Sequence, residues 1–328
     1  MGTMAEFEQL TEESVVWAYR LFLGREPENQ QAIDDALTYV TMDRFRAELL
    51  SCDEFRDRNR FPSQKLSLES PAMDIEWTTD RDIDALIAHV KGTWTRLGLE
   101  RPHWSVLSSE QFLPAQIANH EADFYASGAK DAGQLLATLA RNGISAENLS
   151  RAFEFGCGIG RVTPHLSKMF TQVSACDVSS SHLEIARRVV TKAQRLNVDF
   201  HLVQNATFGM SRPFDLWHSR IVLQHNPPPI IALILRRAFS LLAPGGVAVF
   251  QVPTYAPGYR FRTADYLRSM GARGEIEMHV FPQAAIFQIA RDAGCDPLEV
   301  TEDDSAGVVG WISNVFVFRK AIPARVPA

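Results

Sequence analysis

One stretch of the sequence restricts the possible folds more than any other. Arg151 to Leu166 reads R-A-F-E-F-G-C-G-I-G-R-V-T-P-H-L, with glycines at 156, 158 and 160 directly after a short apolar run. Glycine has no Cβ and adopts backbone conformations that other residues avoid, so such a turn lets the backbone approach a ligand closely. The N–H groups that open the following helix would face any negative group bound there. The stretch therefore predicts a strand, a binding turn and a helix.

The sequence around this turn alternates between two periodicities. From Ser150 onward, short apolar runs alternate with segments of helical spacing, which is typical of βα units and a mainly parallel sheet. The sequence therefore predicts a doubly wound α/β domain. The expected strands are 152–155, 172–176, 199–203, 214–219, 247–252, 298–302 and 313–319, with helices at 162–169, 227–242 and 282–293.

Composition excludes several classes of function. The formal net charge of −6 argues against a nucleic-acid or anionic-membrane partner, because such binding depends on concentrated Lys and Arg. No run of eighteen apolar residues occurs, and the N-terminus lacks a basic-then-apolar signal, so we expect no membrane span. The four cysteines lie far apart without a C-x-x-C pair. We therefore expect a reduced, cytoplasmic protein without a disulfide framework or a metal site.

The first part of the chain reads as mostly helical. Apolar residues recur at helical spacing before about residue 60, and a stretch rich in proline and serine follows. Two further helical stretches come next, one closed by Gly98 and one stopped near Gly128. The expected parts are a small all-α module at 5–62, a linker at 63–78, a helical cap at 79–129 and the α/β domain at 130–328.

The N-terminal helices carry a resemblance of their own. The stretch from Y-R-L-F-L-G-R-E-P to L-L-S-C-D-E-F resembles a small helical module of unknown function, found in bacterial surface-associated proteins and beside glycan-modifying enzymes. We find no catalytic constellation in it. A protein partner or self-association through this module is left open.

Two cofactors fit the glycine turn and the strand after it. That strand ends in Asp177, 21 positions beyond Gly156, where an acid in nucleoside-binding sheets accepts both hydrogen bonds of a ribose diol. A nicotinamide dinucleotide and S-adenosylmethionine both satisfy this geometry. The dinucleotide fingerprint G-x-G-x-x-G needs a third glycine where Arg161 stands, which argues against an oxidoreductase.

With Glu154 before it, the series E-x-G-C-G-x-G-R resembles the first motif of the Rossmann-like (class I) S-adenosylmethionine-dependent methyltransferases. The turn L-L-A-P-G-G at 241–246 and the closing strand pair follow in that family's order, so the resemblance covers about 130 to 320. It implies a seven-stranded, mainly parallel sheet with a reversed last strand. It also implies S-adenosylmethionine as cofactor and S-adenosylhomocysteine as product.

The resemblance further implies a set of cofactor-binding positions. Either Gln204 or Asn205 would lie against the adenine amino group, and Tyr125 would contact the cofactor carboxylate. The glycines could instead only make a tight turn, and Asp177 could cap the next helix. The candidates are Glu154, Gly156, Cys157, Gly158, Gly160, Arg161, Asp177, Gln204, Asn205, Ser219 and Tyr125.

Catalysis would require the removal of a proton if the acceptor is an alcohol. Histidine suits that role near neutral pH, and His225 follows the fourth strand of the α/β domain, with His103 as a second candidate. Trp104 and His279 are candidates for binding the acceptor. Each has a plainer alternative, such as packing between helices for Trp104. Ser219 stands where a metal-dependent subclass needs an acid, so we expect no metal.

We expect O-methylation of a small molecule or a sugar. The preference for a glycan rests only on the resemblance of the N-terminal helices to a module found beside glycan-modifying enzymes. Other readings remain open: an N- or C-methyltransferase of a metabolite, a nicotinamide-dependent oxidoreductase, or a non-catalytic nucleoside-binding adaptor. The run Asn226-Pro-Pro-Pro resembles a motif of amino-methylating enzymes, but it lies beyond the end of the fourth strand, so prolines that start a helix are the better reading.

Overall fold

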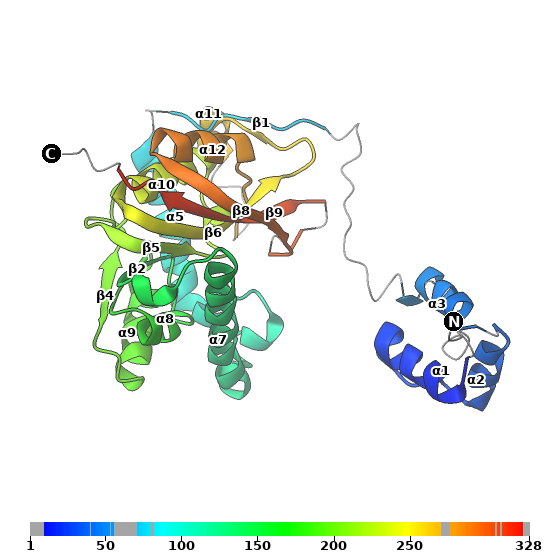
Figure 1. Ribbon diagram of the computed structural model, residues 1–328. Helices are drawn as coiled ribbons and strands as arrows, with labels where there is room; N and C mark the ends of the chain where they lie inside the picture. The colour runs from blue at the N-terminus through cyan, green and yellow to red at the C-terminus, as the bar shows by residue number, and fades with distance from the viewer. Residues whose placement is uncertain are drawn as a thin grey trace. The chain divides into compact units, whose positions relative to one another are not determined.

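The computed structural model describes residues 10–39, 41–52, 54–55, 71–79, 82–269, 276–305, 307–308 and 310–323. The chain divides into two compact units, residues 1–65 and 66–328, which Figure 1 shows coloured along the sequence. Of the expected linker at 63–78, residues 63–70 lie outside the described part, as do both ends of the expected N-terminal module.

The described part of the first unit is helical. Side-chain oxygens of Thr11, Asn29 and Thr41 accept backbone N–H groups at the starts of its helices, which satisfies donors that a helix leaves unpaired. Val15, Leu23 and Phe45 are buried in its own small core. The elements are α1 (Glu12–Ala18), a π-helical turn η1 (Tyr19–Leu23), α2 (Gln30–Leu37) and α3 (Met42–Ser51).

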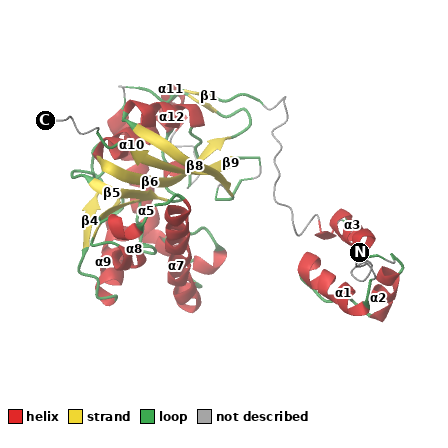
Figure 2. Ribbon diagram, viewed as in Figure 1, coloured by secondary structure: helices red, strands yellow, loops and turns green. Residues whose placement is uncertain are grey.

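The second unit is built on a seven-stranded sheet in the order β4-β3-β2-β5-β6-β9-β8. Figure 2 shows its strands in yellow and the helices around them in red. Neighbouring strands are parallel from β4 to β6, whereas β9 is antiparallel to both β6 and β8. This confirms the predicted doubly wound α/β fold with its reversed last strand. The strands are β2 (Arg151–Phe155), β3 (Gln172–Asp177), β4 (Val198–Leu202), β5 (Phe214–Ser219), β6 (Leu242–Tyr255), β8 (Cys295–Asp303) and β9 (Ile312–Lys320). A separate two-stranded sheet pairs β1 (Asp74–Ile75) with β7 (Arg260–Phe261).

Helices cover both faces of the large sheet, because alternate residues of each buried strand point to opposite sides. Leu216 of β5 packs in the core that contains α7 and α8, and its neighbour Trp217 packs in the core that contains α10 and α12. Among the described residues, no helix has both the length and the apolar character needed to cross a bilayer. The helices are α5 (Ile83–Glu100), α6 (Pro102–Val106), η2 (Glu110–Phe112), α7 (Ile117–Arg141), η3 (Ala146–Asn148), α8 (Thr163–Met169), α9 (Ser180–Lys192), η4 (Leu223–His225), α10 (Pro228–Leu241), α11 (Thr263–Ser269) and α12 (Gln283–Asp292).

Two glycines that were expected to end helices lie inside them. Helix α5 continues past Gly98, and α7 continues past Gly128 and across the expected domain boundary at residues 129–130. Both glycines are needed for close packing: a Cβ at Gly98 would overlap the hydroxyl of Ser179, and one at Gly128 would overlap the carbonyl oxygen of Arg161. The predicted helix stops were therefore wrong, because glycine marks a close approach here rather than a turn.

Substituting alanine at Gly128 should therefore destabilise the protein even though alanine favours helices. We expect a loss of about 1–3 kcal/mol in the free energy of unfolding, because α7 must move away from the glycine turn. Gly133 lies in the same helix, and a Cβ added there would meet no atom within 4 Å. Gly133→Ala should therefore stabilise the protein by about 0.5–1 kcal/mol. Urea unfolding of both variants measures the contrast, and equal stabilisation by both would contradict it.

Candidate functional site

The carboxyl ends of β2, β3 and β5 border a cavity that the cap helices α5 and α6 also line. Ligands of open α/β sheets bind at this edge, where the strand order reverses. The order β3-β2-β5 places that reversal between β2 and β5, beside the cavity. Of the residues singled out in the sequence, the cavity lining brings together Glu154, Gly156, Cys157, Gly158, Arg161, Asp177, Ser219 and His225.

The glycine turn is bare because its neighbours leave no room for side chains. Gly156, Gly158 and Gly160 have φ values of +76°, +52° and +80°, in the left-handed region that side chains disfavour. A Cβ would overlap Val222 at Gly156 and would lie 2.8 Å from Val106 Cγ2 at Gly158. Backbone N–H groups of Gly156 and Cys157 both donate to the Cys176 carbonyl at 2.9 Å. The turn is thus tied to β3 and packed against the cap.

Asp177 is held in place by two backbone donors. Its Oδ2 accepts the Gly158 N–H and its Oδ1 accepts the Ser179 N–H, both at 2.9 Å. A carboxylate oxygen has room for a second hydrogen bond, so both oxygens remain able to accept from a ligand. The side chain is buried, yet it lines the cavity. This arrangement suits the recognition of a diol.

Glu154 lines the same cavity. Burial raises the pKa of its carboxyl to about 7, although a hydrogen bond from Thr163 and the charge of Arg161 lower it. The Thr163 hydroxyl donates to Glu154 Oε2 at 2.7 Å. Near neutral pH the group is therefore divided between its neutral and charged forms, and a cation bound in the cavity would favour the charged form.

The raised pKa of Glu154 predicts a pH-dependent penalty on stability. The pKa of its carboxyl rises from 4.5 to about 7 on folding. Ionisation as the pH rises through that window therefore lowers the free energy of unfolding by up to about 3 kcal/mol. Glu154→Gln keeps an acceptor for Thr163 and removes the titration. We expect the variant to match the wild type near pH 4.5 and to exceed its free energy of unfolding at pH 8.

Denaturation curves at both pH values test this expectation. Glu184→Gln, on an exposed position of α9, controls for the substitution itself. A difference between wild type and Glu154→Gln that stays constant with pH would show that the carboxyl does not titrate in this window.

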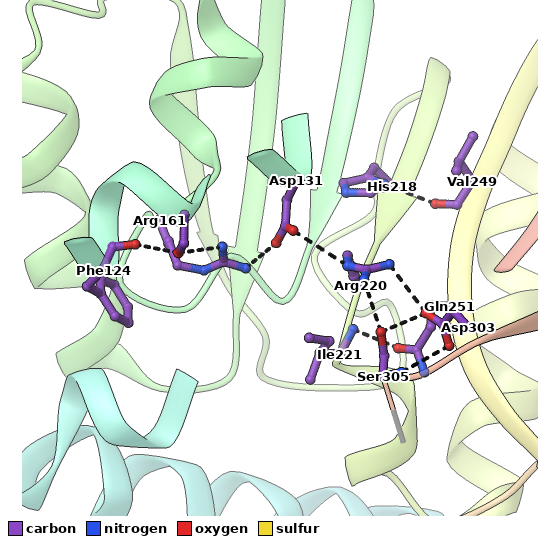
Figure 3. A network of polar contacts seen from close by, with 11 residues as sticks. Phe124, Asp131, Arg161, His218, Arg220, Ile221, Val249, Gln251, Asp303 and Ser305 are labelled. Carbon is purple, nitrogen blue, oxygen red and sulfur yellow. Dashed lines mark hydrogen bonds and ion pairs between the residues drawn. The ribbon is translucent and has the colours of Figure 1, made fainter. Parts of the chain in front are cut away.

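Two arginines beside the cavity share one aspartate. Figure 3 shows Asp131 of α7 between Arg161 and Arg220: Arg161 donates to Asp131 Oδ2, and Arg220 Nε lies 3.7 Å from Asp131 Oδ1. Arg220 also contacts Asp303 Oδ2 at 3.4 Å and donates to Ser305 Oγ at 3.0 Å. The chain of charges links α7, the glycine turn, β5 and β8, and both arginines line the cavity.

His225 also lines the cavity. Its Nδ1 is 2.9 Å from the carbonyl oxygen of Glu277, which can only accept, so Nδ1 carries the proton and Nε2 carries the lone pair. Burial lowers the pKa of His225 to about 4, although the hydrogen bond to Glu277 raises it. The Trp94 ring packs at 5.0 Å from the imidazole. His225 is therefore uncharged at neutral pH.

Several residues predicted for cofactor binding lie elsewhere. Gln204 and Asn205 are exposed, and Asn205 Oδ1 accepts the Thr207 N–H at 3.0 Å in a local turn. Val203 lines the cavity instead. Tyr125 packs 5.2 Å from the Phe124 ring, and burial raises its pKa to about 12. Gly160 shapes the turn without lining the cavity.

The other candidates for catalysis and acceptor binding also lie outside the cavity lining. The His103 ring packs 5.0 Å from Phe124. The Arg101 guanidinium lies 4.6 Å from the centre of the Trp104 ring, which supports the packing alternative. His279 is buried, and its Nδ1 is 2.6 Å from the Tyr259 hydroxyl. Its backbone N–H donates to the Gln224 carbonyl, so it supports the segment that carries His225.

Sequence reasoning missed several residues of the lining, among them Trp94, Ser105, His182 and Arg220. Trp94, Ser105 and Arg220 belong to no sequence motif. Trp94 and Ser105 reach the cavity through the docking of the cap, and Arg220 is the residue after β5. His182 offers one signal: it stands in the first turn of α9, five positions after Asp177. Among the described residues, no group of three or more His, Cys, Asp or Glu is arranged to hold a metal ion.

Comparison with known proteins agrees with this geometry. The family profile described as "Methyltransferase domain" matches residues 126–300, more than half of the chain. The chain belongs to this methyltransferase family.

Curated relatives of the methyltransferase domain are similar over shorter segments. Trans-aconitate 2-methyltransferase of Methylobacterium radiotolerans is 38% identical over 117 residues, 35% of this chain and 42% of that protein. A ubiquinone biosynthesis O-methyltransferase of Albidiferax ferrireducens is 26% identical over 109 residues, 33% of this chain and 42% of that protein. The chain thus spans less than half the length of these two relatives.

A solved methyltransferase shares the fold. Magnesium protoporphyrin IX methyltransferase of Synechocystis PCC 6803, crystallised with S-adenosylhomocysteine, aligns with a TM-score of 0.51 at 16% identity. The alignment covers 72% of this chain and 100% of that chain. The likeness confirms the Rossmann-like methyltransferase fold predicted from the glycine turn.

Proposed function

We propose that the protein is an S-adenosylmethionine-dependent methyltransferase that acts on a hydroxyl group of a small molecule or a sugar. The observation that carries the proposal is one cavity whose lining combines two kinds of group. A bare backbone turn lies beside the fixed carboxylate of Asp177, and the uncharged imidazole of His225 lines the same cavity.

The residues around Asp177 and the glycine turn fit the cofactor. Asp177 would accept hydrogen bonds from the ribose hydroxyls, and Glu154, in its charged form, would pair with the ammonium of the methionine part. Arg161 and Arg220 line the same cavity, so we assign the binding of the cofactor carboxylate to them. Arg161 Nε is buried and finds no hydrogen-bond partner among the described residues, which is consistent with a missing anionic ligand. When bound, S-adenosylmethionine supplies an electrophilic methyl group on a sulfonium.

His225 and the apolar residues of the cap fit the binding and deprotonation of an acceptor. His225 would take the acceptor proton at Nε2, because Nδ1 is committed to the Glu277 carbonyl. Trp94 and Val90 of α5 and Val106 of α6 place apolar surface over the cavity, which limits the access of water. Methyl transfer is a direct displacement, so the rest of the catalysis is the alignment of the acceptor.

The hydroxyl acceptor rests on His225 and on the relatives. An alcohol must lose a proton to become a good nucleophile, whereas a neutral amine already has a lone pair, so a neutral base beside the site favours oxygen. One relative named above is called an O-methyltransferase, which supports the same class. A sugar acceptor is supported only by the resemblance of the N-terminal helices to a module found beside glycan-modifying enzymes.

Asp177→Asn should weaken nucleoside binding, and the wild-type protein should distinguish the two cofactors. We expect at least a tenfold loss of S-adenosylhomocysteine affinity, because the amide is uncharged and its nitrogen cannot accept the backbone and ribose donors; a charged hydrogen bond is worth about 1.5–3 kcal/mol. Calorimetry with S-adenosylhomocysteine and with NAD measures it. Binding of NAD but not of S-adenosylhomocysteine by the wild-type protein would overturn the proposed function.

His225→Gln should lower turnover without changing the affinity for S-adenosylhomocysteine. Loss of a general base costs about 10²–10⁴-fold in rate. With S-adenosylmethionine saturating, so that Glu154 stays charged, the wild-type rate should be nearly constant between pH 8 and pH 6, because the pKa of His225 lies at about 4 rather than 6.5. Formation of S-adenosylhomocysteine across a panel of sugars, nucleotide-sugars, phenols and carboxylic acids measures both the effect of the substitution and the pH dependence. Unchanged turnover of His225→Gln would argue against His225 as the base, and a midpoint near pH 6.5 would contradict its lowered pKa.

A further inference from the structure

A line of three buried polar side chains runs from the cap to the proposed ribose site. Ser105 Oγ of α6 lies 2.9 Å from His182 Nε2, and His182 Nδ1 lies 3.5 Å from Asp177 Oδ1. Ser105, His182 and Asp177 are 4%, 1% and 8% exposed, so the line is shielded from bulk water. His182 Nδ1 is buried and makes no hydrogen bond to any described group, and the Asp177 carboxylate, 3.5 Å away, is the charged group beside it.

The direction of these hydrogen bonds follows from the groups involved. The Asp177 carboxylate accepts, so His182 must carry a proton on Nδ1 to interact with it favourably. Ser105 has one hydroxyl proton, and both His182 Nε2 and the carbonyl oxygen of Pro102 lie 2.9 Å from its oxygen. In that tautomer Nε2 carries the lone pair and accepts the Ser105 hydroxyl proton, for which the Pro102 carbonyl oxygen competes. The Nδ1–H is then on the side of Asp177 Oδ1.

The cap is packed tightly against this line. A Cβ at Gly98 of α5 would overlap the hydroxyl of Ser179 and lie 2.9 Å from the His182 ring. Val106, the neighbour of Ser105, packs so close to Gly158 that a Cβ there would lie 2.8 Å from Val106 Cγ2. The N–H of Gly158 also donates to Asp177. The position of the imidazole is therefore set by the cap on one side and by α9 on the other.

We infer that His182 is a positioning residue for the cofactor ribose: through Nδ1–H it fixes the orientation of the Asp177 carboxylate, and through Ser105 it ties that orientation to the docked cap. This inference rests on the proposed function, in which Asp177 receives the ribose hydroxyls. A carboxylate held by two backbone donors, with an imidazole N–H beside it, presents its remaining acceptor positions in one orientation, so less order is lost when the nucleoside binds.

A hydrolytic serine–histidine–aspartate triad is the rival reading of the same three residues. A serine nucleophile needs the histidine to take its proton, but the Pro102 carbonyl oxygen lies 2.9 Å from Ser105 Oγ and competes for that proton. The Asp177 carboxylate, moreover, is already bound to the Gly158 and Ser179 backbone. The geometry supports positioning and not acyl transfer.

Two substitutions at His182 divide its two contacts. Asn places an amide nitrogen near the position of Nδ1 and so keeps a donor for Asp177, whereas Gln reaches toward Ser105 and loses the donor to Asp177. We expect His182→Asn to bind S-adenosylhomocysteine within about threefold of the wild type. We expect His182→Gln to bind about tenfold more weakly, the effect of one hydrogen bond to a charged group.

A ligand without ribose hydroxyls isolates the positioning role. With the 2′,3′-dideoxy analogue of S-adenosylhomocysteine, wild type, His182→Asn and His182→Gln should bind alike in calorimetry, because Asp177 then has no diol to receive. Equal S-adenosylhomocysteine affinity for His182→Gln and wild type would overturn the inference. An equal loss for both ligands would also overturn it, since it would show a general structural role.

Ser105→Ala keeps the test usable if the His182 variants do not fold. It removes one hydroxyl and leaves the histidine, and it should weaken S-adenosylhomocysteine binding by about threefold, as His182→Asn does, while leaving binding of the dideoxy analogue unchanged. Failure of the proposed function would look different: the wild-type protein would not bind S-adenosylhomocysteine, or Asp177→Asn would bind it as well as the wild type does.

Discussion

The hydrogen bonds that join Asp177 to the Gly158 and Ser179 N–H groups are the constraint on which the site depends. They connect the end of β3 to the glycine turn after β2 and to the start of α9, so three elements share one buried carboxylate. Burying a charge is costly unless donors surround it, and here the backbone supplies them. Glycines lose more conformational freedom on folding than other residues, and these hydrogen bonds help to offset that loss in the turn.

Charge balance has a similar role on the other side of the turn. Arg161 and Arg220 face Asp131 and Asp303, so two positive groups meet two negative ones around the cavity (Figure 3). Removing one member would leave an unpaired charge in poorly solvated surroundings, which is more costly than the net value of the intact set. The arrangement can hold an anionic ligand group while keeping its own charges paired.

The sequence predicted the fold well because the strands around the turn are buried on both faces and their apolar runs are distinct. It also predicted the cavity residues that follow directly from the backbone of β2, β3 and β5, such as Asp177 and Ser219. It misread Gly98 and Gly128, since the close approach of another element is a tertiary property that leaves no local pattern. For the same reason Ser105 and Trp94, which reach the cavity through the docking of the cap, could not be found from motifs.

The place of β9 in the sheet has a consequence for synthesis of the chain. β9 (Ile312–Lys320) lies between β6 and β8, so β8 has no partner strand until β9 has been made. A ribosome must therefore release the chain as far as residue 320 before the sheet can be completed. Until then the β6 edge stays open, and an open edge is a site where another chain can pair. Folding of this unit is thus expected to finish only once its last strand has left the ribosome.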